Sequence, residues 1–268
     1  MIIESLDLKN YRNYDILNMN FDKNVNIIYG DNAQGKTNIL ESIYFCATSK
    51  SHRGSKDKDI VKFGESESHI KANVIKNDIS YRIDMHLKSN KPKGIAVNGI
   101  PIKKAVDLFG IINVVLFLPE DLNIIKDGPS QRRRFMDMEL SQLNKIYLSN
   151  LVNFNKVLGQ RNKLLKELAF NPSEEMISSL DIWDMQFERY GKCIIEGRKK
   201  FIRELNLIIS EIHSKLTGGS EKLVVEYVPF VNEDELGSAL SEYRKKDIKY
   251  KCSCAGPHKD DLVFNING

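Results

Sequence analysis

The feature that most constrains this chain is the motif G-x-x-x-x-G-K-[ST] at residues 30–37. A short apolar run of β type precedes it at residues 25–29, and residues 38–45 follow with apolar positions at helical spacing. In a strand–loop–helix context, the loop N–H groups and the helix N-terminus converge on an anion. The sequence therefore predicts a site for a nucleoside triphosphate.

The motif assigns roles to its residues. Lys36 is expected to reach the β- and γ-phosphates, and the Thr37 hydroxyl is expected to hold Mg²⁺. ATP and Mg²⁺ are therefore the predicted ligands. The residues predicted to line the nucleotide are Gly30, Asp31, Asn32, Ala33, Gln34, Gly35, Lys36 and Thr37.

Composition sets broader limits. The chain has 268 residues, of which 41% are hydrophobic, and a net charge of +4, which is compatible with nucleic-acid binding without requiring it. No apolar run approaches the ~20 residues of a membrane span, and the N-terminus lacks the pattern of a signal peptide, so a cytoplasmic location is expected. Cys252, Cys254 and His258 fit no common zinc spacing, and the four cysteines are expected to be free thiols.

The first part of the chain reads as mostly β-structure. Hairpin turns are expected at Asn77-Asp78 and at Asn98-Gly99, the second of which is a favoured hairpin dipeptide. A buried strand is expected to end at Pro119. The other expected elements are strands at 2–8, 16–21, 70–75, 81–87 and 94–97 and a short helix at 103–109.

From Pro129 the hydrophobic period becomes helical. One apolar stripe extends to Leu168, and after the break at 171–173 a second stripe extends from Met176 to Ile212. These stripes predict an antiparallel pair of helices of ~40 residues, each ~60 Å long. Strands are expected again at 223–228 and 262–266.

Two segments imitate motifs of ATP-hydrolysing proteins. The run 111–118 leads to Glu120 and Asp121, but Pro119 separates these acids from the run, which argues against a Walker B strand. Residues 216–221 imitate the ABC signature, but a β-branched run follows them, so they are predicted to end a helix and begin a strand.

Several segments together resemble the RecF family of recombinational DNA-repair ATPases, which is related to the SMC and Rad50 heads of the ABC class. The P-loop is shared by many proteins, whereas the last three of the matching segments are specific to this family. The matching segments are 8–14, 30–41, 51–53, 119–122, 128–137 and 256–262.

The resemblance implies an α/β fold: an ABC-type P-loop ATPase head with a mixed sheet around the P-loop helix, an antiparallel β-subdomain and a long α-helical hairpin lobe. It places an ATP-binding lobe at 1–120 and the helical-hairpin lobe, returning to strands, at 121–268. In the family, the signature, Walker B and switch histidine follow the segment at 256–262. We therefore expect them beyond residue 268, no catalytic residue within the chain, and no hydrolysis by the chain alone.

The implied activity is that of an ATP-driven homodimer that clamps gapped single- and double-stranded DNA. Slow DNA-stimulated ATP hydrolysis by the full-length protein would release the clamp. A RecR-type mediator is the implied partner, with recombinase loading and SOS induction as the outcome. Arg12 and Glu120 are further nucleotide contacts by this resemblance.

Candidate DNA contacts come from the basic clusters: Arg53, Arg132, Arg133, Lys245 and Lys246. Each cluster taken alone is also explained as a solvated face. Arg132, Arg133 and Arg134 fan out about 100° apart on a helix, so one or two are expected to hold that helix against the ATP lobe.

Two other classes of protein share the P-loop. A small-molecule kinase would place an acceptor site and a mobile lid beside the loop, in place of a helix pair of ~60 Å. A structural head of the SMC or Rad50 kind would carry far longer helical arms.

Overall fold

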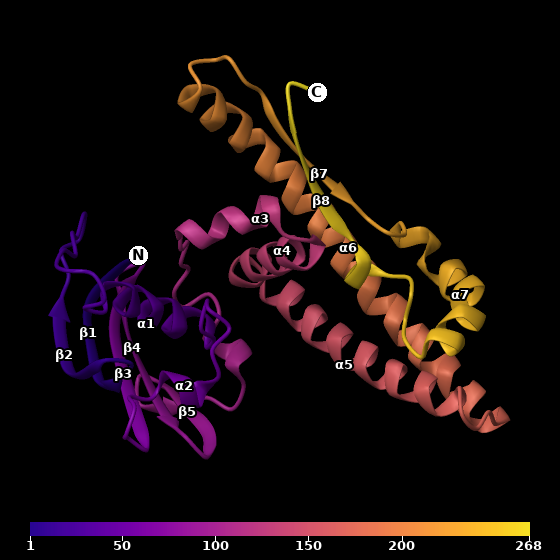
Figure 1. Ribbon diagram of the computed structural model, residues 1–268, viewed down its shortest axis with the longest axis horizontal. Helices are drawn as coiled ribbons and strands as arrows, with labels where there is room; N and C mark the ends of the chain where they lie inside the picture. Colours follow the sequence, from indigo (N-terminus) through magenta and orange to yellow (C-terminus); the bar gives the residue numbers. More distant parts are fainter. The chain divides into compact units, whose positions relative to one another are not determined.

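The computed structural model describes residues 1–268, apart from the side chain of Ala105. The chain divides into two compact units, Met1–Phe117 and Leu118–Gly268, which are described separately (Figure 1).

The first unit is built on a six-stranded sheet with the order β2-β1-β3-β4-β5-β6, in which every pair of neighbouring strands is antiparallel. Its elements are β1 (Ile2–Tyr11), β2 (Tyr14–Asn20), α1 (Lys36–Thr48), α2 (Asp57–Ile60), β3 (Glu67–Lys76), β4 (Ile79–Lys88), β5 (Lys91–Val97), β6 (Ile100–Pro101) and the 3-10 turn η1 (Ala105–Leu108).

The two predicted hairpin turns are confirmed. Asn77 and Asp78 join β3 to β4 with φ of 50° and 61°, and Asn98 and Gly99 join β5 to β6 with φ of 52° and 79°. Consecutive positive φ angles match the right-handed twist of the paired strands, which explains the preference for Asn, Asp and Gly.

One face of this sheet is buried by α1. Alternate residues of β3 and β4 point into the core, among them Ile70 and Ile83, and they join Ile39 and Phe45 of the helix in a single cluster. Figure 1 shows α1 lying against the sheet. The opposite face carries polar side chains, as the alternation of the strands requires.

Two strand predictions are wrong. Residues 25–29 and 113–118 have no strand pairing, although their composition is apolar. Val25, Ile27 and Tyr29 are 78%, 81% and 90% exposed, and Phe117 is 75% exposed. An apolar run becomes a strand only where a neighbouring strand pairs with it, and neither run belongs to the described sheets. The sheet is therefore antiparallel, without the mixed pairing expected around the P-loop helix.

The second unit is mostly helical, with a two-stranded sheet of β7 and β8. Its elements are the 3-10 turns η2 (Pro119–Leu122), η3 (Glu233–Glu235) and η4 (Pro257–Lys259), the helices α3 (Asn123–Lys126), α4 (Pro129–Leu143), α5 (Lys145–Leu168), α6 (Glu174–Leu216) and α7 (Leu236–Tyr250), and the strands β7 (Leu223–Val228) and β8 (Asp261–Ile266).

The predicted helical hairpin is present, but its first arm is shorter than expected. Asn144 leaves the helical conformation, and its side chain accepts hydrogen bonds from the N–H groups of Ile146 and Tyr147, so it ends α4 and caps α5. The second arm, α6, has 43 residues and is about 64 Å long at 1.5 Å per residue. The strands β7 and β8, which were predicted, and α7, which was not, lie along the hairpin (Figure 1).

Buried arginines tie the second unit together. Arg161 of α5 is fully buried, and it donates to Asp184 of α6 at 2.6 Å and to Asp247 of α7 at 2.7 Å. Arg198 of α6 donates to Asp260 at 2.9 Å, just before β8. Removal of either guanidinium would take a countercharge from buried carboxylates, so these ion pairs fix how the elements meet.

No helix among the described residues is long and apolar enough to cross a membrane. All four cysteines are free, as predicted, and Cys46 is buried in the core of the first unit.

Candidate nucleotide-binding site

The P-loop of the first unit leads directly into a helix. Residues 30–35 form an irregular loop, and α1 begins at Lys36 with Gly35 as its N-cap. Gly35 has φ of 99°, and its carbonyl accepts the N–H groups of Asn38 and Ile39 at 2.7 and 3.2 Å. The N-terminus of a 13-residue helix therefore opens at the motif, with its dipole directed at the loop.

Lys36 arches back over this loop. Its Nζ atom donates to the carbonyl oxygens of Gly30 at 2.6 Å and Asp31 at 2.7 Å. A cation held at the rim of a loop of backbone N–H groups lies where an anion would bind. Thr37 is the next residue in the first helical turn, the position from which a hydroxyl can hold a phosphate-bound Mg²⁺.

The N-terminal turn between β1 and β2 packs against the P-loop. Asn13 Nδ2 and the Tyr14 hydroxyl both donate to the carbonyl of Gln34, at 3.1 and 3.3 Å. A Cβ atom on Gly35 would lie 2.6–2.7 Å from the polar atoms of these two side chains. Only glycine fits between the turn and the loop, so the turn dictates the shape of the phosphate cradle.

Arg12 in the same turn is bound to the P-loop helix. Its Nε and Nη2 atoms donate to the two carboxylate oxygens of Glu41 at 2.8 and 2.7 Å, and Nη1 donates to the carbonyl of Asp59. Ser51 adds a hydrogen bond to Glu41 at 2.5 Å. With every nitrogen of its guanidinium engaged in this way, Arg12 braces α1 in this structure, and its contact with nucleotide remains a prediction.

The electrostatics of this pair agree with the geometry. Burial by itself would raise the pKa of the Glu41 carboxyl, but hydrogen bonds from Arg12 and Ser51 outweigh burial and lower that pKa. The hydrogen bond to Glu41 raises the pKa of Arg12. Both groups are therefore ionised, and the buried carboxylate depends on its guanidinium partner.

A chain of hydrogen bonds extends from the N-terminal turn to Arg53. Asn38 Nδ2 donates to Asn13 Oδ1 at 2.8 Å, and the Arg53 guanidinium donates to Asn38 Oδ1 at 3.3 Å. Arg53 is exposed and lies beside the first turn of α1. This places the basic segment 50–56 next to the P-loop.

The remaining predicted contacts lie in the second unit. Glu120 and Asp121 belong to η2, where Asp121 Oδ2 accepts the Leu118 N–H at 2.7 Å and caps its own turn. Asp121 therefore has a local structural role, which agrees with rejecting a Walker B strand. The nucleotide contact predicted for Glu120 remains a prediction. The imitation of an ABC signature ends α6 at Leu216, with β7 beginning at Leu223, as predicted.

Arg132 and Arg133 are engaged within the second unit. Arg132 binds both carboxylate oxygens of Asp261, at 2.6 and 3.0 Å, and Arg133 donates to the carbonyl of Asp260 at 2.6 Å. They hold α4 to the start of β8, and the expectation that one or two of the three arginines hold α4 against the ATP lobe stays a prediction. Lys245 and Lys246 of α7 are exposed.

Sequence reasoning gave no role to Glu41, Asn13 or Tyr14. All three lie in segments that carry the family resemblance, but only the folded turn brings them to the P-loop. The available signal was the polar turn between two alternating strands. Asn10 near the end of β1 and Arg12 in the turn have φ of 51° and 52°.

Comparisons with known proteins agree with this architecture. A family model described as an AAA domain matches residues 5–249. Proteins named DNA replication and repair protein RecF from Lachnospira eligens and Agathobacter rectalis are 70% and 54% identical to the whole chain, which covers 74% of each.

Solved structures give the same result. A structure described as the recombination mediator protein RecF-ATP in the RecFOR pathway is 33% identical to the chain with a TM-score of 0.94. A second, with RecF-ATPrS, has a TM-score of 0.92 at the same identity, and the chain covers 74% of each. The predicted fold class, an α/β ATPase head, is therefore confirmed. The chain belongs to the RecF family of DNA replication and repair proteins.

Proposed function

We propose that this chain is the ATP-binding part of a DNA-repair switch, in which nucleotide bound at the P-loop controls attachment to DNA. The observation that carries the proposal is the folded cradle at residues 30–37, with Lys36 Nζ at its rim and Gly35 pressed against the N-terminal turn. One solved relative is described as RecF-ATP, and ATP is a ligand that this cradle fits.

Different residues of the cradle would contact different parts of the triphosphate. On arrival of the triphosphate, Lys36 exchanges the carbonyls of Gly30 and Asp31 for β- and γ-phosphate oxygens, which gains charge-assisted hydrogen bonds. Loop N–H groups and the dipole of α1 hold the remaining phosphate charge. Mg²⁺, held through Thr37, would neutralise part of that charge.

Equilibrium titration with a fluorescent ATP analogue tests the nucleotide site. Lys36→Ala is expected to weaken binding by at least ~2 kcal/mol, about 30-fold in Kd, the scale of a lost charge-assisted hydrogen bond. Lys91→Ala, an exposed lysine on a hairpin remote in sequence, is the matched control and should leave the Kd unchanged. Equal affinity for wild type and Lys36→Ala would remove the P-loop assignment.

The proposed partner is DNA, since the chain belongs to a family whose relatives are named for DNA replication and repair. We further propose an ATP-dependent homodimer that works with a RecR-type mediator in the cytoplasm, consistent with a relative described as a recombination mediator of the RecFOR pathway. Slow hydrolysis by the full-length protein would release DNA.

The candidate DNA contacts differ in whether their side chains are already bound to other groups of the protein. Lys245 and Lys246 are exposed, and the Arg53 guanidinium donates a long hydrogen bond of 3.3 Å to Asn38. Arg132 and Arg133 are committed to the start of β8. We therefore expect substitutions at Lys245 and Lys246 to lower DNA affinity without loss of fold, and substitutions at Arg132 to act mainly through stability.

A further inference from the structure

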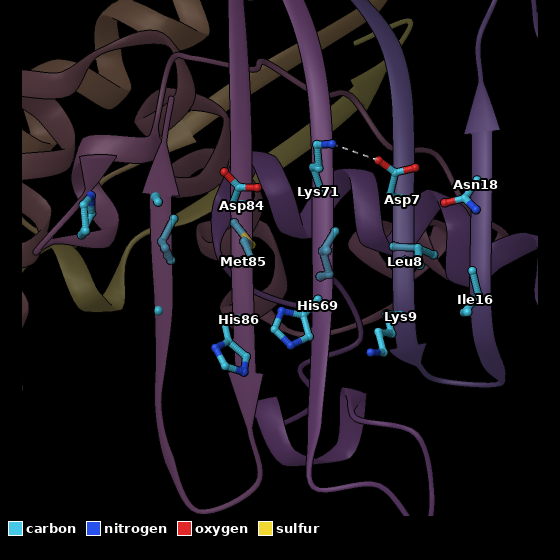
Figure 2. A pocket seen from close by; sticks show the side chains of 15 residues that line it. Asp7, Leu8, Lys9, Ile16, Asn18, His69, Lys71, Asp84, Met85 and His86 are labelled. Atoms are coloured by element: carbon cyan, nitrogen blue, oxygen red, sulfur yellow. Dashed lines mark ion pairs between the residues drawn. The ribbon is translucent and has the colours of Figure 1, made fainter. Parts of the chain in front are cut away.

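The solvent face of the sheet in the first unit carries a cluster that the nucleotide site does not use. His69 of β3 and His86 of β4 are direct cross-strand partners in the antiparallel register. Glu67 lies two residues before His69, so its side chain is on the same face. Figure 2 shows His69 and His86 side by side on this face.

The side chains of Glu67, His69 and His86 lie close together. The two imidazole rings stack with centroids 4.0 Å apart and an interplanar angle of 21°. Each ring approaches a different oxygen of Glu67: His86 Nε2 lies 2.9 Å from Oε2, and His69 Nε2 lies 3.7 Å from Oε1. One ligand atom from each residue falls within 4.8 Å of the other two.

The surroundings leave room for a further ligand. His69 and His86 line an open trough of about 590 Å³ on the sheet, together with Lys9, Ile16 and Asn18. These five residues come from β1, β2, β3 and β4, which are hydrogen-bonded neighbours in one sheet (Figure 2). Ligands mounted on paired strands are held more rigidly than ligands on loops.

We propose that Glu67, His69 and His86 bind one divalent cation of the zinc class, with a fourth coordination position open to the trough. Two imidazole nitrogens and one carboxylate, with one position left for water or another ligand, are a donor set that Zn²⁺ takes in proteins. Imidazole suits Zn²⁺, Cu²⁺ and Ni²⁺, whereas Mg²⁺ prefers oxygen ligands, so this site is chemically separate from the P-loop.

The alternative is a purely electrostatic cluster. Lys88 Nζ lies 3.8 Å from Glu67 Oε2, so Glu67 already has a cationic neighbour. The two explanations differ in what a substitution does. If Lys88 is the true partner of Glu67, the histidines have no joint function; if a metal is the partner, Lys88→Ala removes a competing cation and leaves metal affinity equal or higher.

The test uses protein without a polyhistidine tag and with Cys252→Ser and Cys254→Ser, because free thiols also bind zinc. Co²⁺ is titrated by visible absorption and then displaced by Zn²⁺, with circular dichroism to confirm that each variant is folded. One equivalent is expected to bind. His69→Ala and His86→Ala should each lower the affinity at least tenfold, since even changes to supporting residues cost about 10–100-fold.

His213→Ala is the matched control, because His213 also pairs with a glutamate, Glu221, at 2.9 Å, but lacks a second histidine. His213→Ala should leave the metal affinity unchanged. Lys88→Ala should leave the metal affinity unchanged or raise it. Equal Zn²⁺ affinity in the starting protein and in the His69→Ala/His86→Ala double variant would overturn the proposal. A loss of affinity in His213→Ala equal to that in His86→Ala would also overturn it.

Discussion

Arg12→Ala should destabilise the first unit far more than a typical surface ion pair would suggest. The guanidinium makes two hydrogen bonds to Glu41, whose side chain is fully buried, while the Arg12 side chain is only 16% exposed. After the substitution, the carboxylate keeps Ser51 as its hydrogen-bond donor but loses its countercharge. Breaking a buried pair in this way costs about 3–5 kcal/mol, and the value expected here is about 3 kcal/mol because Ser51 remains.

The loss of stability in Arg12→Ala should depend on pH. In the wild type, hydrogen bonds lower the pKa of Glu41, so the pair stabilises the fold above the unfolded pKa of about 4.3 and this contribution is lost as pH falls through the lower folded value. In Arg12→Ala, the buried carboxylate loses its countercharge and two hydrogen bonds, which raises that pKa, and the carboxyl becomes neutral at a higher pH. The difference in stability between the two proteins should therefore shrink as pH falls from neutral, because Glu41 of the variant takes up its proton at a higher pH than Glu41 of the wild type.

Urea unfolding followed by circular dichroism, with hydrogen exchange of α1 and β3 amides to report on the first unit, measures this difference. Arg82→Ala is the matched control, because its pair with Asp84 is 49% and 36% exposed and should contribute about 0–1 kcal/mol. A loss of less than about 1 kcal/mol in Arg12→Ala, or a loss that does not change with pH, would refute the role given to this pair.

Three further substitutions have expected outcomes. Gly35→Ala should weaken ATP binding and lower stability by at least about 1 kcal/mol in the assays above, because φ is 99° and the new methyl group would meet Asn13 and Tyr14; a neutral result would contradict the packing. Asn144→Ala should cost about 1 kcal/mol in urea unfolding through the lost cap of α5, whereas no change would mean that the cap is dispensable. Burial lowers the pKa of His258 to about 4, below the unfolded value of about 6.5, so the fold should lose stability as pH falls between these values. His258→Gln should flatten this dependence in an acid titration followed by tryptophan fluorescence, and an unchanged slope would count against it.

Local patterns predicted the elements whose causes are local. The turns at Asn77-Asp78 and Asn98-Gly99 follow from residues that tolerate positive φ, and α6 follows from its long apolar stripe. The P-loop prediction had the same character, because a glycine loop leading into a helix is a feature of consecutive residues.

The errors occurred where partners distant in sequence decide the outcome. Residues 25–29 have the composition of a strand but pair with no strand among the described residues, so Val25, Ile27 and Tyr29 remain exposed. The break at Asn144 is an exception with a local cause, because its side chain caps α5 two and three residues further on and thereby interrupts the apolar stripe. The contact of Arg12 with Glu41 spans 29 positions in sequence, and no periodicity in the chain encodes it.

The central claim, that nucleotide at the P-loop controls attachment to DNA, is tested most directly by DNA affinity with and without ATP–Mg²⁺ over a range of salt concentrations. Fluorescence anisotropy of the full-length protein with gapped duplex should show tighter binding with ATP for the wild-type sequence and no ATP effect for Lys36→Ala. The logarithm of the affinity should fall by about 0.9 per phosphate neutralised for each unit of log salt, and Lys245→Ala/Lys246→Ala should reduce that slope. Equal DNA affinity of the wild type with and without ATP, or a response to ATP that survives Lys36→Ala, would contradict the account.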